Sequence, residues 1–209
     1  NGNLSLKDLP AGSVVGTSSI RRRSQILSKR KDLKIKLLRG NVDTRIQKLN
    51  NGDYDAIVLS HAGLVRLKKD HLVSDLFATD EFLPASCQGA VGIQLATQKN
   101  NQTLIDSLKK INHYDTELTC SAEREVLRCI NANCNSPVSV YATINEDKIL
   151  IQCQLFDHTG LLLFNELVSD KVANYLTLAQ QLGKKIISDI GQKTIDELDV
   201  LKDDFNYSP

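Results

Sequence analysis

The chain has 209 residues, 41% of them hydrophobic, which is enough for one large domain or two smaller ones. No apolar run reaches the roughly 18 residues of a membrane-spanning helix, and five cysteines without the spacing of a small disulfide scaffold favour reduced thiols in an intracellular protein. The net charge of +1 conceals an asymmetry, because residues 1–69 hold 15 Lys and Arg against 5 Asp and Glu, whereas the remainder holds 11 against 20. We therefore expect the basic part to handle an anion, although many of its lysines would serve only as solvated helix faces.

The basic part repeats one pattern, in which a short apolar run leads into a polar turn and then an amphipathic segment. Strand-like runs cover residues 13–16, 33–38 and 54–60, and the last (YDAIVLS) is apolar enough to be buried on both faces. A helical segment follows each run, at residues 20–31, 42–52 and 61–71. Three successive strand–loop–helix units predict an α/β domain with a parallel, doubly wound sheet.

The pattern changes at residues 82–96, where Pro84 and two glycines indicate a turn that leads into a β-rich crossing segment. Helices are expected at 101–113 and 115–130, and a long amphipathic helix from 172 onward. Between them, runs at 138–146, 148–157 and 161–169 are separated by short DK and HTG turns and predict three antiparallel strands. This last part is predicted to be a small α+β domain.

Hydroxyl and guanidinium groups gather at the predicted start of the first helix. Thr17, Ser18 and Ser19 precede it, and Arg21, Arg22 and Arg23 lie in its first turn, where cations oppose the helix dipole. Similar groups follow the next two strands: Arg39, Gly40, Asn41, Arg45 and Arg66, the last expected near the start of the third helix. Because the carboxyl ends of parallel strands meet at one edge, these residues predict a site for carboxylates or phosphates.

Two cysteines flank the end of the 115–130 helix. Cys129 ends that helix, and Cys134 lies in the polar loop after it, where it could be a disulfide partner, a metal ligand, a nucleophile or an attachment point. Cys129, Cys134, His113 and His158 lack zinc-site spacing, so a metal site is not expected. The spacing leaves nucleophile and attachment point open for Cys134.

Other reactive residues carry weaker signals. Cys87 lies in the turn after Pro84 and has no obvious role, and His61 could be an acid or base but is more simply structural. The two carboxylates of the segment CSAERE (120–125) are interpreted as a solvated helix face.

Five segments occur in a characteristic order along nearly the whole chain: LPAGSVVGTSSIRRRSQ, LLRGNVDTRIQKL, YDAIVLSHAGLVRL, LPASCQGAVGIQ and NCNSPVSVYA. With these motifs the sequence resembles the porphobilinogen deaminase (hydroxymethylbilane synthase) family of haem and tetrapyrrole biosynthesis. The resemblance implies a doubly wound domain similar to periplasmic binding proteins, followed by a small C-terminal α+β domain. Residues 1–86 would form domain 2, 87–112 the crossover and the C-terminal part of domain 1, and 113–209 domain 3. Most of domain 1 would be absent, leaving the chain inactive alone or one piece of an enzyme.

The resemblance also implies a transferase that joins four porphobilinogen units head to tail on a dipyrromethane cofactor, releasing ammonia and then hydroxymethylbilane. Cys134 would hold the cofactor through a thioether bond. The catalytic aspartate would lie in the absent region, so no residue of this chain is expected to be catalytic. The residues implied to bind the acetate and propionate groups of cofactor and substrate are Thr17, Ser18, Ser19, Arg21, Arg22, Arg39, Gly40, Asn41, Arg45, Arg66 and Gln88.

Two departures from the family pattern concern cysteine-bearing turns. Asn133 precedes Cys134 where the family has glycine, and we expect asparagine to supply the left-handed conformation that glycine permits. Cys87 stands where the family has glycine before Gln88.

The expected partners are porphobilinogen and the growing polypyrrole chain, with no membrane and no nucleic acid, in a monomer that includes the absent domain. The expected compartment is the cytoplasm, or alternatively a plastid. The alternative function is a non-catalytic module that binds small anions or nucleic acid with the basic lobe. Against nucleic acid, that lobe has Tyr54 as its one aromatic residue for stacking on bases.

Overall fold

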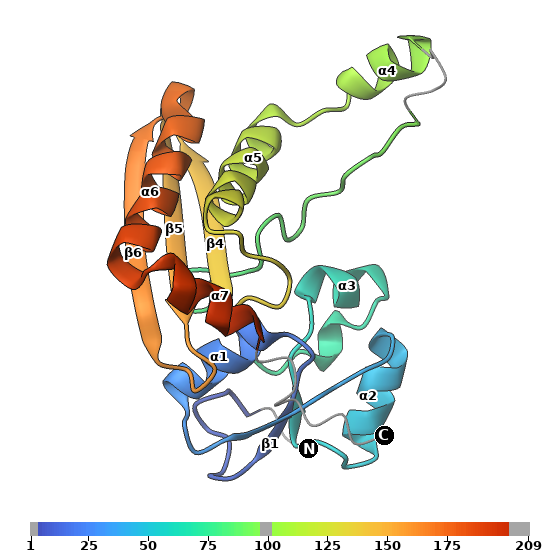
Figure 1. Ribbon diagram of the computed structural model, residues 1–209. Helices are drawn as coiled ribbons and strands as arrows, with labels where there is room; N and C mark the ends of the chain where they lie inside the picture. The colour runs from blue at the N-terminus through green and yellow to red at the C-terminus, as the bar shows by residue number, and fades with distance from the viewer. Residues whose placement is uncertain (1–3, 97–101, 201–209) are drawn as a thin grey trace.

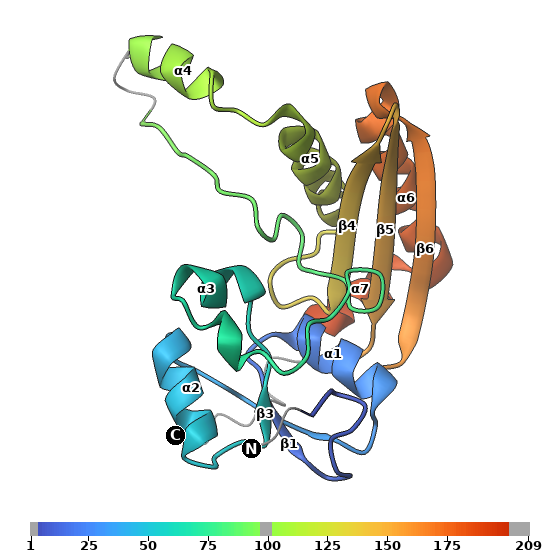
Figure 2. The ribbon, with the colours of Figure 1, turned by 180° about the vertical axis from the view of Figure 1, so that it is seen from behind.

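The computed structural model describes residues 4–96 and 102–200 and divides them between two lobes (Figures 1 and 2). The first lobe holds a small parallel sheet with its helices, and the second holds a longer antiparallel sheet covered by helices. Within the described part, no helix combines the length and apolar character needed to cross a membrane.

The first lobe is built on three parallel strands in the order β2-β1-β3. The strands are β1 (Val14–Gly16), β2 (Lys34–Lys36) and β3 (Ala56–Ile57). The helical elements are α1 (Ile20–Lys29), α2 (Val42–Asn50), α3 (His61–Arg66) and the short 3₁₀ helix η1 (Asp70–Leu72). The predicted strand–helix alternation and the parallel pairing are therefore confirmed.

Two expectations for the third unit are wrong. The run 54–60 contributes only a two-residue strand, and its residues 56–60 are half-buried rather than buried on both faces. The neighbouring strand β1 ends at Gly16, whose carbonyl accepts from Val58 N at 3.1 Å, so the ladder has no partner beyond this point. The helix that follows ends at Arg66, because Lys68 adopts a left-handed conformation (φ 56°).

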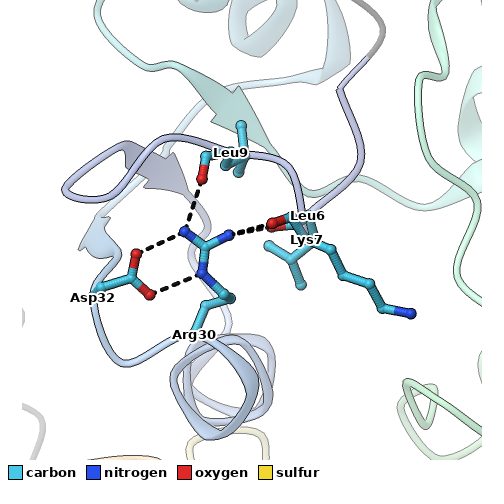
Figure 3. Close-up of polar contacts among 5 residues, drawn as sticks. All are labelled: Leu6, Lys7, Leu9, Arg30 and Asp32. Carbon is cyan, nitrogen blue, oxygen red and sulfur yellow. Dashed lines mark hydrogen bonds and ion pairs between the residues drawn. The ribbon is translucent and has the colours of Figure 1, made fainter.

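Arg30, immediately after α1, ties the amino-terminal segment to this lobe (Figure 3). Its guanidinium makes two parallel hydrogen bonds to the Asp32 carboxylate, at 2.8 and 2.6 Å. The remaining donors reach the carbonyl oxygens of Leu6, Lys7 and Leu9 at 2.7–3.0 Å. One side chain thus provides hydrogen bonds for three loop carbonyls and holds the segment that leads into β1 in place.

The crossover between the lobes differs from the prediction. Residues 73–96 contain turns, including one at 86–89, but no strand, so the expected β-rich segment is wrong. Strands need a neighbour for their backbone hydrogen bonds, and no described strand pairs with this segment. After it, α4 (Gln102–Lys109) lies apart from both lobes, and the chain returns from there to α5 (Figures 1 and 2).

The second lobe is an antiparallel sheet in the order β4-β5-β6 with helices on one face (Figure 1). Alternate inward residues such as Val140, Ile151 and Leu155 are buried, which explains the period-two pattern of the sequence. The three predicted strands are confirmed, although the first turn is formed by Glu146 and Asp147. The elements are α5 (Tyr114–Cys129), β4 (Val138–Asn145), β5 (Lys148–Phe156), β6 (Leu162–Lys171), η2 (Val172–Asn174), α6 (Tyr175–Ile190) and α7 (Gln192–Val200).

The long carboxyl-terminal helix of the prediction is two helices. Gly191 adopts φ 86° and ψ 133°, a conformation that favours glycine and ends α6, and α7 begins at Gln192. Within α6, Gly183 allows close approach to α5, because a β-carbon there would lie 2.4 Å from Cys129 Cβ.

Contacts of α1 join the two lobes. Gln25 of α1 donates through Nε2 to the carbonyl of Leu83 in the crossover and to Ser139 Oγ of β4, at 3.0 and 3.1 Å. Gly160, in the turn between β5 and β6, packs against the backbone of α1, where an added β-carbon would lie 2.6 Å from Ser28 N. The middle and the carboxyl-terminal end of α1 are therefore held by contacts with the second lobe.

Candidate functional site

The amino-terminal end of α1 has the predicted hydroxyl cap. Ser19 is the N-cap residue, and its Oγ accepts from Arg22 N at 3.3 Å. Thr17 is buried, and its Oγ1 accepts from Ser19 N at 3.2 Å, while Ser18 is exposed. No acidic residue lies in the first turn of α1, so nothing in that turn offsets the positive end of the helix.

Three guanidinium groups, those of Arg21, Arg22 and Arg45, form what we call the arginine cluster. Each is held by a single hydrogen bond to a backbone carbonyl: Arg21 Nη1 to Leu83 O (2.5 Å), Arg22 Nη1 to Val58 O (3.0 Å) and Arg45 Nε to Gly40 O (2.8 Å). Across residues 4–96 and 102–200, none of the three is in an ion pair with a carboxylate. Their remaining N–H groups are therefore available to an anion.

Burial and neighbouring positive charge both act on the pKa values of the cluster. Burial and the neighbouring charge of Arg22 lower the pKa of Arg21 to about 10. Burial and the charge of Arg45 lower the pKa of Arg22 as well. The guanidiniums remain protonated at neutral pH, so their repulsion and desolvation are costs that a bound anion would relieve.

The turn before α2 brings Arg45 to this place. Asn41 caps α2 by accepting from Thr44 N at 2.9 Å. Gly40 adopts φ 116°, and a β-carbon there would lie 2.8 Å from Thr44 Cγ2, so the turn requires glycine. Arg39 is exposed, and its carbonyl accepts from Lys48 Nζ at 3.3 Å. The RGN motif therefore shapes the turn and directs Arg45 Nε onto the Gly40 carbonyl.

Two predicted site residues, Arg66 and Gln88, make no hydrogen bond to the arginine cluster among the described residues. Arg66 is the last residue of α3 and is exposed, so its expected position near the start of that helix is wrong. Gln88 is also exposed, and its Oε1 accepts from Ala85 N at 3.3 Å within its own turn. A role for either in binding stays a prediction.

Cys134 is exposed in the loop between α5 and β4, which extends toward the first lobe on the side of α3 in both views (Figures 1 and 2). Asn133 braces this loop, because its N–H donates to Ser136 Oγ at 2.8 Å and its Oδ1 accepts from Asn135 N at 2.8 Å. The expected left-handed conformation at Asn133 is wrong: the left-handed residue of this loop is Asn131 (φ 55°). Asparagine replaces glycine here through side-chain hydrogen bonds rather than backbone freedom.

Sequence reasoning missed the polar residues that support the site. The missed residues are Ser24 and Gln25, which form a buried polar stripe on α1 with the predicted Arg21, at spacings i, i+3 and i+4 that could have been read as an inward face. The carboxylates of CSAERE do not form a solvated face. Glu123 is only 4% exposed, and Glu125 is half-buried with hydrogen bonds to Arg128.

Glu123 links three segments of the chain. Its Oε1 accepts from Ala142 N of β4 at 2.8 Å, and its Oε2 accepts from Cys87 N in the crossover turn. Burial raises the pKa of this carboxyl, and these backbone donors oppose the rise. No spacing signal connects Glu123 with Cys87, because the contact depends on tertiary packing.

Comparisons with known proteins identify the family that this sequence matches. Residues 1–104 match the family model described as "Porphobilinogen deaminase, dipyromethane cofactor binding domain", and residues 117–191 match "Porphobilinogen deaminase, C-terminal domain". The "Porphobilinogen deaminase" of Albidiferax ferrireducens is 40% identical over 185 residues, which are 88% of this chain and 58% of that protein. The "Porphobilinogen deaminase, chloroplastic" of Oryza sativa subsp. japonica is 46% identical over 143 residues, which are 68% of this chain and 39% of that protein. The chain thus spans less than two thirds of the length of either relative, and neither match supports a nucleic-acid-binding module.

Proposed function

Because the chain belongs to the porphobilinogen deaminase family, we propose that it acts in a hydroxymethylbilane synthase, a transferase that joins four porphobilinogen units head to tail and releases ammonia. The observation that carries the proposal is the arginine cluster: three guanidiniums on the helices that follow β1 and β2, each bonded to a backbone carbonyl and with no carboxylate partner among the described residues. Ligands of α/β sheets bind outside the carboxyl ends of the strands, which these helices follow.

The chemistry of the ligand fits that cluster. Each porphobilinogen unit carries an acetate and a propionate group, so a growing chain gains two negative charges with every addition. Guanidiniums form bidentate, charge-assisted hydrogen bonds with carboxylates. Arg21, Arg22 and Arg45 would neutralise this negative charge. The backbone N–H groups at the start of α1 would stabilise the same carboxylates further. No residue of this chain is assigned to proton transfer.

The residues present also suit a dipyrromethane cofactor, which the matching family model names. An exposed thiol in a loop held by the Asn133 and Ser136 hydrogen bonds can form a thioether bond, and a guanidinium cluster can hold the four carboxylates of two pyrrole units. Cys134 would be the attachment point. The bound group supplies the primer to which new units are joined, while this chain binds, orients and neutralises it.

Finer features belong to the same proposal. Residues 1–86 would correspond to a domain similar to periplasmic binding proteins, 87–112 to the crossover and 113–209 to the cofactor-bearing domain. The strand order β2-β1-β3, with α1 and α2 as crossovers, supports the first assignment. We further propose a monomer that binds no nucleic acid, located in the cytoplasm or in a plastid.

Intact mass of the natural polypeptide that carries this chain tests the proposal. We expect a mass excess equal to two deaminated porphobilinogen units, lost in Cys134→Ser and kept in Cys129→Ser. Cys129 is the matched control because it lies five residues away and packs against Gly183. An unmodified Cys134 in folded protein purified from cells that make porphobilinogen would contradict the assignment.

A further inference from the structure

A cluster of two thiols and a carboxylate lies outside the arginine cluster. Cys87 belongs to the crossover turn, whereas Cys120 and Glu123 lie three residues apart on one face of α5. The two sulfur atoms and a carboxylate oxygen all lie within 4.8 Å of one another. The proposed roles of Cys134 and the arginines make no use of these three groups.

The cluster is built into the fold rather than scattered over its surface. Glu123 is 4% exposed, and both thiols are half-buried. Through its hydrogen bonds to the N–H groups of Cys87 and Ala142, the Glu123 carboxylate fixes the turn against α5 and β4. Each of its oxygens accepts one hydrogen bond and keeps lone-pair capacity for a second partner.

Cys87 holds an unfavourable backbone conformation. Its φ of 59° is left-handed, a region that disfavours residues with a β-carbon relative to glycine. Glycine would relieve this cost without disturbing the hydrogen bond made by the backbone N–H. The Cys87 thiol donates to the backbone carbonyl oxygen of Cys120 at 3.7 Å, which holds it beside the second thiol and the carboxylate.

We propose that Cys87, Cys120 and Glu123 form a binding site for a thiophilic divalent cation of the zinc class. Two sulfurs and one carboxylate oxygen are donors that such ions prefer, and a water molecule would complete four-coordination. Zinc–sulfur and zinc–oxygen bonds of about 2.3 and 2.1 Å separate tetrahedral ligands by about 3.5–3.8 Å. That separation falls within the 4.8 Å limit of the cluster, so the three donors lie near the spacing that such an ion requires.

Protonation opposes the cation at this site. Burial and the adjacent Cys120 raise the pKa of the Cys87 thiol to about 12, with Glu123 adding to the rise and Arg124 opposing it. The cation must therefore displace thiol protons, and its affinity should rise with pH. Once bound, it would link the crossover to α5, next to the Gln88–Gly89 turn.

Titration of the reduced chain with Cd²⁺, and separately with Zn²⁺, under anaerobic conditions tests the site. We expect one equivalent bound per chain, with a cadmium–thiolate charge-transfer band and release of protons. Cys87→Gly should abolish the band and raise stability, because glycine suits the positive φ; Cys120→Ser should also abolish it. Glu123→Gln should weaken binding by at least about 10–100-fold, because that is the loss caused by removing a group that only supports a ligand, and Glu123 is itself a ligand.

Cys129→Ser and Cys134→Ser are matched controls, because both replace thiols outside the cluster and should leave the band unchanged. Three results would overturn the proposal: no stoichiometric binding, a band that persists in Cys87→Gly, or a Cys87–Cys120 disulfide in protein purified without reductant. Far-UV circular dichroism establishes that each variant is folded. The site does not depend on the dipyrromethane proposal, whose test is the mass at Cys134.

Discussion

Replacing Gly183 by alanine should destabilise the second lobe, even though alanine favours helices. The added β-carbon would lie 2.4 Å from Cys129 Cβ and 3.2 Å from its sulfur. Carbon atoms in contact prefer about 3.5–4.0 Å, so α5 and α6 would have to separate by more than 1 Å. Because Cys129 Cβ is attached to the backbone, no side-chain rotation relieves the clash.

The magnitude follows from two opposing effects. Overpacking a buried site costs about 1–3 kcal/mol, and exchanging glycine for alanine inside a helix returns about 1 kcal/mol. Separation of the helices would also loosen Val126 and Leu182, both buried in the core of this lobe. The overpacking cost minus the helix-propensity gain leaves a range of about 0–2 kcal/mol. Because two core residues would also loosen, we expect the free energy of unfolding to fall by about 1–2 kcal/mol.

Urea unfolding followed by circular dichroism measures the effect. Gly63→Ala is the matched control, because Gly63 lies within α3 and a β-carbon there would meet nothing within 4 Å. It should stabilise the protein by up to about 1 kcal/mol. The double variant with Cys129→Gly should be less destabilised than the sum of the single variants. If Gly183→Ala raised stability as Gly63→Ala does, the close approach of α5 and α6 would be refuted.

Three further predictions follow from particular contacts. Arg22→Gln should weaken porphobilinogen binding by about 10–100-fold in calorimetric titration, the value of a charge-assisted hydrogen bond, whereas Lys29→Gln at the far end of α1 should not; equal losses would mean that only net charge matters. Gly160→Ala should lower the urea midpoint more than Gly52→Ala, since both have positive φ (88° and 83°) but only Gly160 meets α1; equal shifts would contradict that contact. Hydrogen bonds from neighbouring side chains hold the pKa of Glu125 at about 2, below its usual 4.5, so its contribution to stability is present above pH 4.5 and lost as the pH falls toward 2. Glu125→Gln should therefore cost stability at pH 6 and little at pH 2, as measured by urea unfolding; an equal cost at both would exclude the ionised carboxylate as the cause.

Much of the first lobe could be predicted from sequence because its signals are local. The apolar run 13–16, the capping Ser19 and the turn at Gly40–Asn41 act through hydrogen bonds only a few residues long. The same holds for the three strands of the second lobe, whose alternation reflects one buried face. Where the local signal was ambiguous, as at 82–96 and around Gly191, the prediction was wrong.

The candidate site was predictable in its chemistry but less so in its geometry. Arginines after successive parallel strands indicated an anion site, and the structure brings Arg21, Arg22 and Arg45 together. It does not place Arg66 near the start of its helix, since a left-handed residue two positions later ends that helix early. The sequence by itself could not tell a guanidinium aimed inward from one aimed at solvent.

By itself the sequence determined much of the local structure and predicted an anionic ligand, because periodicity, caps and charge are carried by neighbouring residues. Only the tertiary structure decided which distant groups meet. The burial of Arg21 against the Leu83 carbonyl joins residues 62 positions apart, and the Cys87–Glu123 contact joins residues 36 positions apart. Such contacts depend on how α1, the crossover and the second lobe pack together, and no short-range pattern encodes that packing.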